Sequence, residues 1–295
     1  MKTKTAMITI AGRPNVGKST LTNYLVGEKI AIVSNKPQTT RNRICGIVTR
    51  EDTQFVFVDT PGFHKARTKL GDYMVNTVRE SIADVDATVL VVEPIASVGT
   101  QEEMLLEQLA AKKCPVILAI NKIDTVEKEA LLEVIAVYSA AFEFAAIIPI
   151  SARKGDGVEL LLNECGKFAQ DGPFLFPEDL TTDQPERQVM AEIIREMLLW
   201  CLDREIPHGT AVEITKFSER DSGIIDLDAT IYCEKASHKG IIIGKGGEML
   251  KKISSMARTD CEKFMGTKVY LTTWVKVKES WRDSDFFIRN FGYRE

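Results

Sequence analysis

The chain has 295 residues, of which 44% are hydrophobic and 27% charged, so it is long enough for two globular domains. Its formal net charge of −4 argues against binding nucleic acid through bulk positive charge, but leaves room for a local basic patch. The six cysteines lie far apart without a C-x-x-C pair, which disfavours a zinc site or disulfide framework and favours a reducing, cytoplasmic compartment. No apolar run approaches the ~18 residues of a membrane span, and the N-terminus does not resemble a secretory signal.

The first motif is a glycine-bounded loop that follows an apolar run of strand length, residues 6–11. Residues 12–19 match the pattern G-x-x-x-x-G-K-[ST] at every fixed position, and a short helix over 19–27 is predicted to follow. In that setting the backbone N–H groups point at phosphate oxygens beside the positive end of the helix. Lys18 is expected to reach the β- and γ-phosphates and Ser19 to ligate Mg²⁺. The predicted phosphate-binding residues are Gly12, Arg13, Pro14, Asn15, Val16, Gly17, Lys18, Ser19 and, further along the chain, Gly62.

The rest of the first half alternates between strand and helix patterns. Two runs joined by a polar turn predict an antiparallel hairpin, and the later strands each precede a helix. This alternation predicts an α/β domain over residues 1–171, with a mostly parallel sheet covered by helices on both faces and ligands at the carboxyl ends of its strands. The expected strands are 44–49, 54–58, 87–92, 116–120 and 147–150, and the expected helices are 70–82, 101–111, 128–141 and 158–169.

Two motifs after predicted strands indicate which nucleotide binds. Asp124, in the tetrapeptide N-K-x-D, can accept hydrogen bonds from the ring N–H and the exocyclic amine of guanine, which adenine cannot supply. The Ser-Ala-Arg tripeptide at 151–153 is expected to offer backbone N–H groups to the guanine carbonyl oxygen. Each motif alone is a weak signal, but both in this order indicate GTP and GDP as ligands. The predicted guanine-binding residues are Asn121, Lys122, Asp124, Ser151, Ala152 and Arg153.

Two further polar segments complete a resemblance to a known family. A turn-prone loop at 36–41 and the sequence Asp59-Thr60-Pro61-Gly62-Phe63, together with 12–19, resemble the translation-factor-related GTPases and, within them, the Era family of bacterial ribosome-assembly GTPases. Asp59 is expected to hold Mg²⁺ through water, and the Gly62 N–H to sense the γ-phosphate. The resemblance implies that Thr40, or less favourably Thr39, joins Ser19 and Asp59 as an Mg²⁺ ligand when GTP is bound. The implied switch residues are Gln38, Thr39, Thr40 and Arg41 in switch I, and Asp59, Thr60, Pro61, Gly62 and Phe63 in switch II.

Hydrolysis is expected to be slow. Ras-like enzymes orient the attacking water with a glutamine where this chain has Phe63, so a rate on the order of 10⁻⁴–10⁻² s⁻¹ is predicted. In related GTPases an asparagine at the place of Asn15 ligates K⁺, which offsets charge between the phosphates. The alternative is that Asn15 only caps the loop, and the sequence leaves both interpretations open.

The second half predicts a smaller α+β domain. Residues 172–187, rich in proline, glycine and aspartate, are expected to link it to the first domain, and residues 188–295 to form it. The predicted order is helix, strand, strand, helix, loop, helix, strand, which resembles the type II KH topology. The expected elements are helices 189–202 and 248–264, and strands 210–217, 224–233 and 269–277.

A G-x-x-G loop at 244–247 matches the loop with which KH domains clamp about four nucleotides of RNA. The bases are expected to lie over a groove built from Ile241, Ile242, Ile243 and the facing strand. Residues 188–295 hold 10 Lys and 7 Arg against 7 Asp and 10 Glu, a net charge of zero, so affinity must come from a local cluster. The candidate basic residues are Lys239, Lys245, Lys251, Lys252 and Lys263, and the predicted RNA-binding set is Ile243, Gly244, Lys245, Gly246, Gly247 and Lys251.

The resemblance to the Era family covers nearly the whole chain, including 274–278 and the closing Gly292-Tyr293. It implies a GTP-controlled protein that binds the 3′ end of 16S ribosomal RNA during assembly of the 30S subunit. We expect a monomer, although the sequence leaves the oligomeric state open. The rival interpretation is a regulatory GTPase associated peripherally with the inner face of the cell membrane, whose C-terminal domain binds protein instead of RNA.

Overall fold

The structure is a computed structural model, and it describes residues 2–36, 39–62, 68–81 and 85–293. Contacts between Cα atoms divide the chain into two compact units. The first unit comprises Met1–Ala31, Thr40–Ala66 and Met74–Asp183, and the second comprises Ile32–Thr39, Arg67–Tyr73 and Gln184–Glu295. The predicted domain limits of 1–171, 172–187 and 188–295 stay a prediction.

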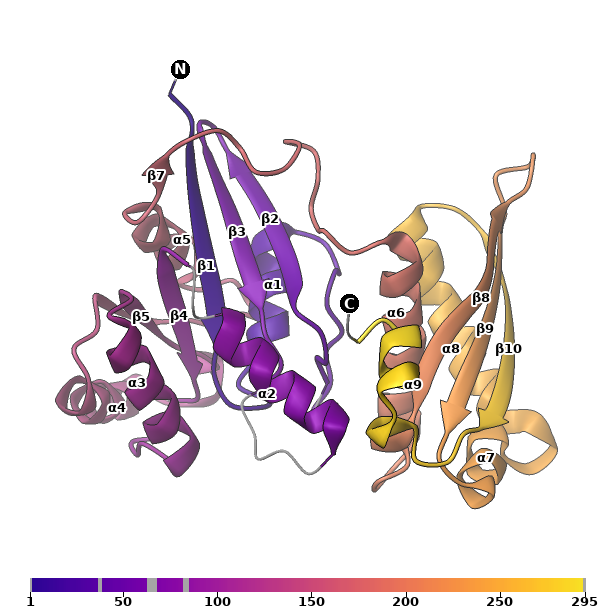
Figure 1. The fold of residues 1–295 in the computed structure, drawn as a ribbon. Helices are drawn as coiled ribbons and strands as arrows, with labels where there is room; N and C mark the ends of the chain where they lie inside the picture. The colour runs from indigo at the N-terminus through magenta and orange to yellow at the C-terminus, as the bar shows by residue number, and fades with distance from the viewer. Residues whose placement is uncertain (1, 37–38, 63–67, 82–84, 294–295) are drawn as a thin grey trace. The chain divides into compact units, whose positions relative to one another are not determined.

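The first unit is built on one mostly parallel sheet, with strand order β2-β3-β1-β4-β5-β6 (Figure 1). β2 pairs antiparallel with β3 and forms the expected hairpin, whereas the neighbours from β3 to β6 are all parallel. A short β7 adds an antiparallel pair at the start of β1. The strands are β1 (Lys4–Ala11), β2 (Ile44–Arg50), β3 (Thr53–Asp59), β4 (Ala87–Val92), β5 (Val116–Ile120), β6 (Ala146–Pro149) and β7 (Gln170–Asp171).

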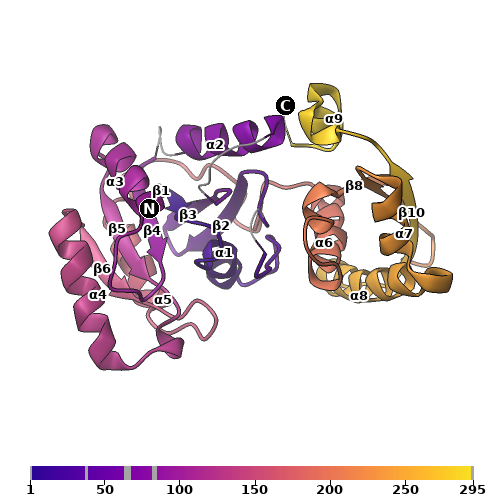
Figure 2. The same ribbon diagram turned by 90° about the horizontal axis from the view of Figure 1, so that it is seen from below.

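Helices cover both faces of this sheet, as the alternating strand and helix patterns predict. Alternate strand residues such as Ile8 and Ile10 pack with α1 and α5 in one core, whereas Leu90 and Val92 pack with α2, α3 and α4 in the other. Figure 2 shows α1 and α5 on one side of the sheet and α2 and α3 on the opposite side. The α/β fold class is therefore confirmed. The helices are α1 (Lys18–Val26), α2 (Lys69–Ser81), α3 (Thr100–Lys112), α4 (Lys128–Ala141) and α5 (Val158–Gly166).

Residues 172–183, which we call the strap, run back along the edge of the sheet. The Gln54 side chain in β3 is fully buried; its Oε1 accepts from the N–H groups of Leu175 and Phe176 at 2.9 and 3.0 Å, and its Nε2 donates to the Phe176 carbonyl at 2.9 Å. The Ile47 N–H in β2 donates to the Thr181 carbonyl at 2.8 Å. The strap thus satisfies backbone groups of an edge strand that would otherwise be open to pairing with another chain.

The second unit has the order predicted for a type II KH domain. Its sheet runs β10-β9-β8, with β8 and β9 antiparallel and β9 and β10 parallel. One face of the sheet packs against α6, α7 and α8 through a core that includes Ile194, Leu227 and Ile253. The elements are α6 (Glu186–Cys201), β8 (Ala211–Glu219), β9 (Ile225–Cys233), α7 (Ala236–Ile243), α8 (Glu248–Met265), β10 (Val269–Val277) and α9 (Asp285–Asn290).

The C-terminal aromatic residues anchor the end of the chain to this unit. Trp281 is fully buried, and its indole N–H donates to the Gly209 carbonyl at 2.9 Å. Its ring also packs edge-on against Phe291 and stacks with Tyr293. These aromatic side chains therefore form a buried cluster in the second unit.

Replacing Gln54 with alanine leaves two N–H groups and one carbonyl of the strap without their partner. We expect this to lower the free energy of unfolding of the first unit by about 2–3 kcal/mol, measured by far-UV circular dichroism in urea. Tryptophan fluorescence should keep its midpoint, because all three tryptophans (Trp200, Trp274 and Trp281) lie in the second unit. Gln101→Ala, at an exposed position of α3, is the control; equal dichroism midpoints for both variants would contradict the prediction.

Candidate functional site

The loop at 12–19 joins β1 to α1 and requires glycine at both ends because of close approaches. A Cβ atom on Gly12 would lie 2.4 Å from the Val91 carbonyl oxygen, and one on Gly17 would lie 2.2 Å from Nδ2 of Asn121. Gly17 also has a φ of 103°, in the left-handed region that side chains disfavour. The two glycines therefore let the loop lie directly against the ends of β4 and β5.

Lys18 lies almost fully buried across this loop. Its Nζ donates to the carbonyls of Gly12 and Arg13 at 3.0 and 3.1 Å. Burial lowers the pKa of Lys18 to about 8, and the nearby Asp59 carboxylate opposes that shift. An anion entering the loop would favour the charged form of this ammonium group, so the position suits phosphate.

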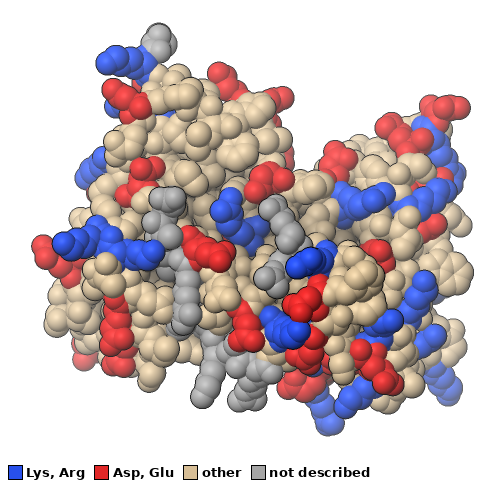
Figure 3. Space-filling view, in the orientation of Figure 1, with Lys and Arg blue, Asp and Glu red and all other residues tan. Residues whose placement is uncertain are grey.

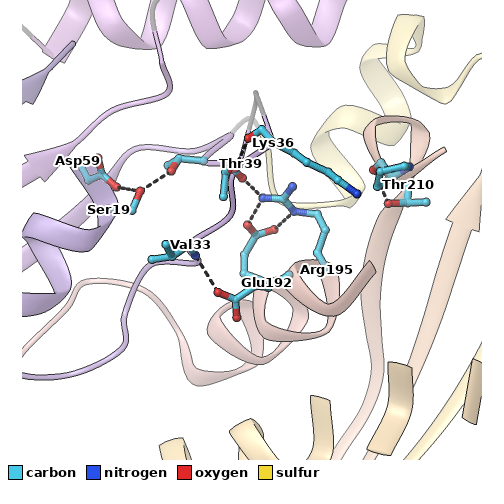
Figure 4. Close-up of polar contacts among 11 residues, drawn as sticks. Ser19, Val33, Lys36, Thr39, Asp59, Glu192, Arg195 and Thr210 are labelled. Atoms are coloured by element: carbon cyan, nitrogen blue, oxygen red, sulfur yellow. Dashed lines mark hydrogen bonds and ion pairs between the residues drawn. The ribbon is translucent and has the colours of Figure 1, made fainter. Parts of the chain in front are cut away.

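Three oxygen-bearing side chains meet beside Lys18. The Ser19 hydroxyl donates to Asp59 Oδ2 at 2.8 Å, and Ser19 Oγ lies 2.8 Å from Thr40 Oγ1 (Figure 4). Because Ser19 has one proton and gives it to Asp59, the Thr40 hydroxyl must donate to Ser19. Thr39, the other switch I threonine, instead donates its hydroxyl to the Lys36 carbonyl at 2.6 Å.

Asp59 is the group of this cluster that fits a cation. Its carboxylate is fully buried, and Oδ1 has no hydrogen-bond partner among the residues that the structure describes. Burial raises the pKa of Asp59 to about 6, and Lys18 and Ser19 act in the opposite direction. An orphaned buried carboxylate oxygen beside two hydroxyls is a donor set suited to Mg²⁺.

The two predicted guanine motifs meet at the same edge of the sheet. Asn121 Nδ2 donates to the Val16 carbonyl at 2.8 Å, and Asn121 Oδ1 accepts from the Ala152 N–H at 2.9 Å. Asp124 Oδ1 accepts from the Ser151 hydroxyl at 2.7 Å, and this bond holds the pKa of Asp124 below its usual value. The Asp124 carboxylate is therefore ionised, as an acceptor for two N–H donors must be. Its side chain is also exposed.

The remaining predicted residues lie in different settings. The Thr60 hydroxyl donates to the Ile10 carbonyl at 3.0 Å, and a Cβ on Gly62 would lie 2.8 Å from Pro14, so both pack on the phosphate-loop side of the sheet. Pro61 and Arg41 are buried, whereas Arg153 is exposed, and its charge contributes to lowering the pKa of Asp124. Gln38 and Phe63 lie outside the described residues.

The structure adds two acids that the sequence reasoning missed. Glu93 lies 2.9 Å from the Arg13 guanidinium and 2.6 Å from the Lys122 ammonium, and Glu102 lies 2.7 Å from Arg13 Nε. Glu93 directly follows a strand that ends at the ligand edge, so its position could have been noticed. Glu102 lies on α3, and nothing in its local sequence indicates a buried ion pair.

The G-x-x-G loop of the second unit lies between α7 and α8. Gly244, Gly246 and Gly247 have φ values of 75°, 61° and 86°. A Cβ on Gly246 or Gly247 would meet nothing within 4 Å, whereas one on Gly244 would lie 2.7 Å from the Met249 Cβ. The first glycine is therefore required by packing, and the other two leave open space in front of the backbone.

The expected isoleucine groove is wrong in one residue. Ile242 is fully buried in the core, and only Ile241, 49% exposed, and the half-buried Ile243 lie at the surface. A helical turn over α7 places adjacent side chains about 100° apart, so three consecutive residues cannot face one groove.

The basic residues near this loop form a limited cluster. Lys245, Lys251 and Lys252 are exposed, whereas Lys263 pairs with Asp260 at 3.2 Å. On the face of the second unit drawn in Figure 3, lysine and arginine alternate with aspartate and glutamate. A long-range positive field is therefore not expected, and contacts with a nucleic acid backbone must be local.

Two general findings limit other kinds of site. Within the described residues, no helix is both long and apolar enough to cross a bilayer, and no group of three or more His, Cys, Asp or Glu side chains is placed to bind a metal. All six cysteines are free thiols.

A P-loop with guanine-recognition motifs on a parallel sheet, followed by a KH fold, defines a GTP-binding protein with a nucleic-acid-binding module. Comparisons agree: residues 7–122 match the family described as 50S ribosome-binding GTPase, and residues 205–282 match the KH domain family.

Full-length relatives identify the family. The chain is 52% identical over 294 residues to the GTPase Era of Ruminiclostridium cellulolyticum, covering 100% of this chain and 99% of the relative, and 51% identical to that of Clostridium kluyveri, covering 99% of each. Solved structures that match include an Aquifex aeolicus Era variant bound to GDP and AlF4⁻, and Era in complex with MgGDPNP and nucleotides 1506–1542 of 16S ribosomal RNA. Both are 35% identical, with TM-scores of 0.95 and 0.94, and each comparison covers 99% of this chain and 100% of the solved one. The chain belongs to the Era family of GTPases.

Proposed function

We propose that this GTPase is a switch whose guanine nucleotide controls binding of the 3′ end of 16S ribosomal RNA by its KH unit, in assembly of the 30S subunit. The observation that carries the proposal is the combination, in one chain, of the Lys18–Ser19–Asp59 cluster with an open, left-handed G-x-x-G loop. The RNA complex of a relative that matches the whole chain supports the choice of RNA. We further propose a cytoplasmic monomer.

We assign the nucleotide contacts by the chemistry of each group. Loop amides and Lys18 bind the phosphates, and Asp124, Asn121 and the backbone of 151–153 bind guanine. Ser19, Thr40 and Asp59 would hold Mg²⁺, which neutralises phosphate charge when bound. The Mg²⁺ complex of a relative supports this assignment.

We propose that Asn15 takes part in slow, K⁺-stimulated hydrolysis. Asn15 has a φ of 66°, which asparagine tolerates better than most residues, and its carbonyl accepts from Lys122 Nζ at 2.7 Å. The residue is therefore fixed in an unusual backbone conformation inside the phosphate loop. A residue held in this way is more consistent with a ligand than with a simple cap.

The route from nucleotide to RNA begins in switch I, where adjacent residues make their contacts in different units. Thr40 contacts Ser19 in the first unit, whereas Val33 and Thr39 contact α6 in the second (Figure 4). There the fully buried Arg195 donates to the Thr39 carbonyl, and the Val33 N–H donates to Glu196 at 2.8 Å. Movement of Thr40 with the nucleotide would change the strain on these contacts through the chain itself.

Arg195 is held for this role by an acid on its own helix. Glu192 pairs with the Arg195 guanidinium, and this pairing raises the pKa of Arg195 although burial alone would lower it. The guanidinium therefore stays charged and oriented toward the Thr39 carbonyl.

Mg²⁺ retention should depend on pH through Asp59. Because burial raises the pKa of this acid to about 6, the carboxylate is protonated below that pH and cannot ligate the cation. We expect the apparent Mg²⁺ affinity of the GDP complex to be flat above pH 7 and to fall about tenfold per pH unit below 6, measured by release of a fluorescent GDP. Asp52→Asn, in the exposed hairpin turn, should keep this profile; a flat wild-type profile down to pH 5 would exclude the assignment.

The potassium assignment predicts a difference between two salts. GTP hydrolysis by the wild type should be severalfold faster in KCl than in NaCl at equal ionic strength, and Asn15→Ala should lose this difference. Phosphate release under single-turnover conditions is the measurement. Equal rates in both salts would show that Asn15 only caps the loop.

The RNA assignment predicts loss of binding in Gly246→Asp and Gly247→Asp, because a carboxylate at the open loop repels phosphate. We expect at least a tenfold weaker affinity for an oligonucleotide of the 16S 3′ end, by fluorescence anisotropy. Gly223→Asp is a matched control, since Gly223 also has a positive φ and open space but lies in the β8–β9 turn. With about three phosphate contacts, the wild-type salt slope should be near −2. If the wild type binds no RNA, the rival protein-binding GTPase becomes the better interpretation.

The substitution Arg195→Gln tests the proposed coupling between the bound nucleotide and RNA binding. In the wild type, the RNA affinities with a GTP analogue and with GDP should differ by about 5–150-fold, the usual range for coupled sites. The variant should bring this ratio close to one, while Arg289→Gln, at an exposed position of α9, leaves it unchanged. Glu196→Ala, which removes the acceptor of the Val33 N–H, gives a second route to the same result. An unchanged ratio in both variants with normal thermal stability would refute the coupling route.

A further inference from the structure

The guanine motif also binds the phosphate loop through two hydrogen bonds to loop carbonyls. Asn121 donates to the Val16 carbonyl, and the neighbouring Lys122 donates to the Asn15 carbonyl at 2.7 Å. Two consecutive side chains therefore bind two consecutive carbonyls. Asn121 is also held by the Ala152 N–H, so its position is well determined. Lys122 has a flexible four-carbon side chain and needs a partner to stay in place.

Glu93 supplies that partner. It follows β4, and its two carboxylate oxygens contact different cations: Oε1 lies 2.6 Å from Lys122 Nζ, and Oε2 lies 2.9 Å from Arg13 Nη2. Arg13 is also held at Nε by Glu102 at 2.7 Å. The contacts form a closed path that leaves the phosphate loop at Arg13, crosses Glu93 and Lys122, and returns to the loop at Asn15.

We propose that Glu93 is a positioning residue for guanine-nucleotide binding, which clamps the phosphate loop to the guanine motif through Arg13 and Lys122. In this proposal, separation of the phosphate loop from the base-binding motif weakens their joint hold on the nucleotide. The Glu93 carboxylate resists this motion because it holds one residue of each. The proposal rests on the nucleotide assignments above and adds a residue that contacts no nucleotide.

The burial of these side chains decides how strongly their ion pairs hold the phosphate loop to the guanine motif. Exposed pairs contribute little, since water and salt screen them. Here the side chains of Arg13, Glu93 and Lys122 are only 26–36% exposed, and Glu102 is 4% exposed. Without the Glu93 charge, Lys122 would lose its acidic partner, whereas Arg13 would keep only Glu102. The loss should therefore exceed that of an ordinary surface pair.

The test is the dissociation rate of a fluorescent GDP from the full-length protein. We expect Glu93→Gln, which keeps the side-chain shape, to release GDP about tenfold faster, with little change in the association rate. Glu103→Gln removes the same charge from an exposed position of α3 and should behave as wild type. Tight GDP binding by the wild type separately tests the nucleotide site itself, so the two failures can be told apart.

Two further readouts separate positioning from simple damage to the fold. Lys122→Gln should also speed release, and adding Glu93→Gln to it should increase release by a smaller factor than Glu93→Gln does alone, because the Glu93–Lys122 contact is already lost. The difference between Glu93→Gln and wild type should also shrink in 1 M salt, which screens ion pairs. Wild-type release by Glu93→Gln, effects that simply add, or a difference that persists in 1 M salt would overturn the proposal.

Discussion

The nucleotide site depends on the close approach of Asn121 to the phosphate loop. This amide is buried, donates to the Val16 carbonyl and accepts from the Ala152 N–H, so it joins three segments that are far apart in the sequence. The approach is so close that only a glycine at 17 leaves room for it. A buried amide with both ends bonded costs more to disturb than a surface contact, which gives the site a fixed geometry before any nucleotide binds.

Glycine serves different purposes in the two units. At Gly12 and Gly17 a side chain would collide with neighbouring atoms, so these residues make the loop compact. At Gly246 and Gly247 nothing lies within 4 Å of a Cβ position, so packing within the protein does not require glycine there. The remaining reasons for glycine at these two positions are the positive φ and the open approach to the backbone. Both suit a loop that binds a ligand.

The segment proposed as switch I changes its contact partners within one peptide bond. Thr40 joins the cluster of Ser19 and Asp59, whereas the Thr39 carbonyl accepts from Arg195 on α6. Because the two contacts are made by adjacent residues, movement of one residue would affect the contact of the other. This is the physical form that coupling between a nucleotide and an RNA-binding unit would take here.

The class of both units, the nucleotide motifs and the order of strands and helices, apart from β7 and α9, could be predicted from the sequence. Alternating strand and helix patterns specify which faces are buried, and motifs such as Asn121–Asp124 need residues at fixed spacing after a strand. The isoleucine groove was the clear error, since Ile242 turned inward with the helical period of α7.

Other features were decided only by the tertiary structure. The strap along β2 and the Glu93–Arg13–Lys122 network both join residues that are distant in the sequence. A charged residue alone on a strand end or a helix carries no local signal of its partner, because an ion pair depends on distance in space. The sequence alone therefore determined the fold class and the kind of ligand, and packing determined which side chains hold the site together.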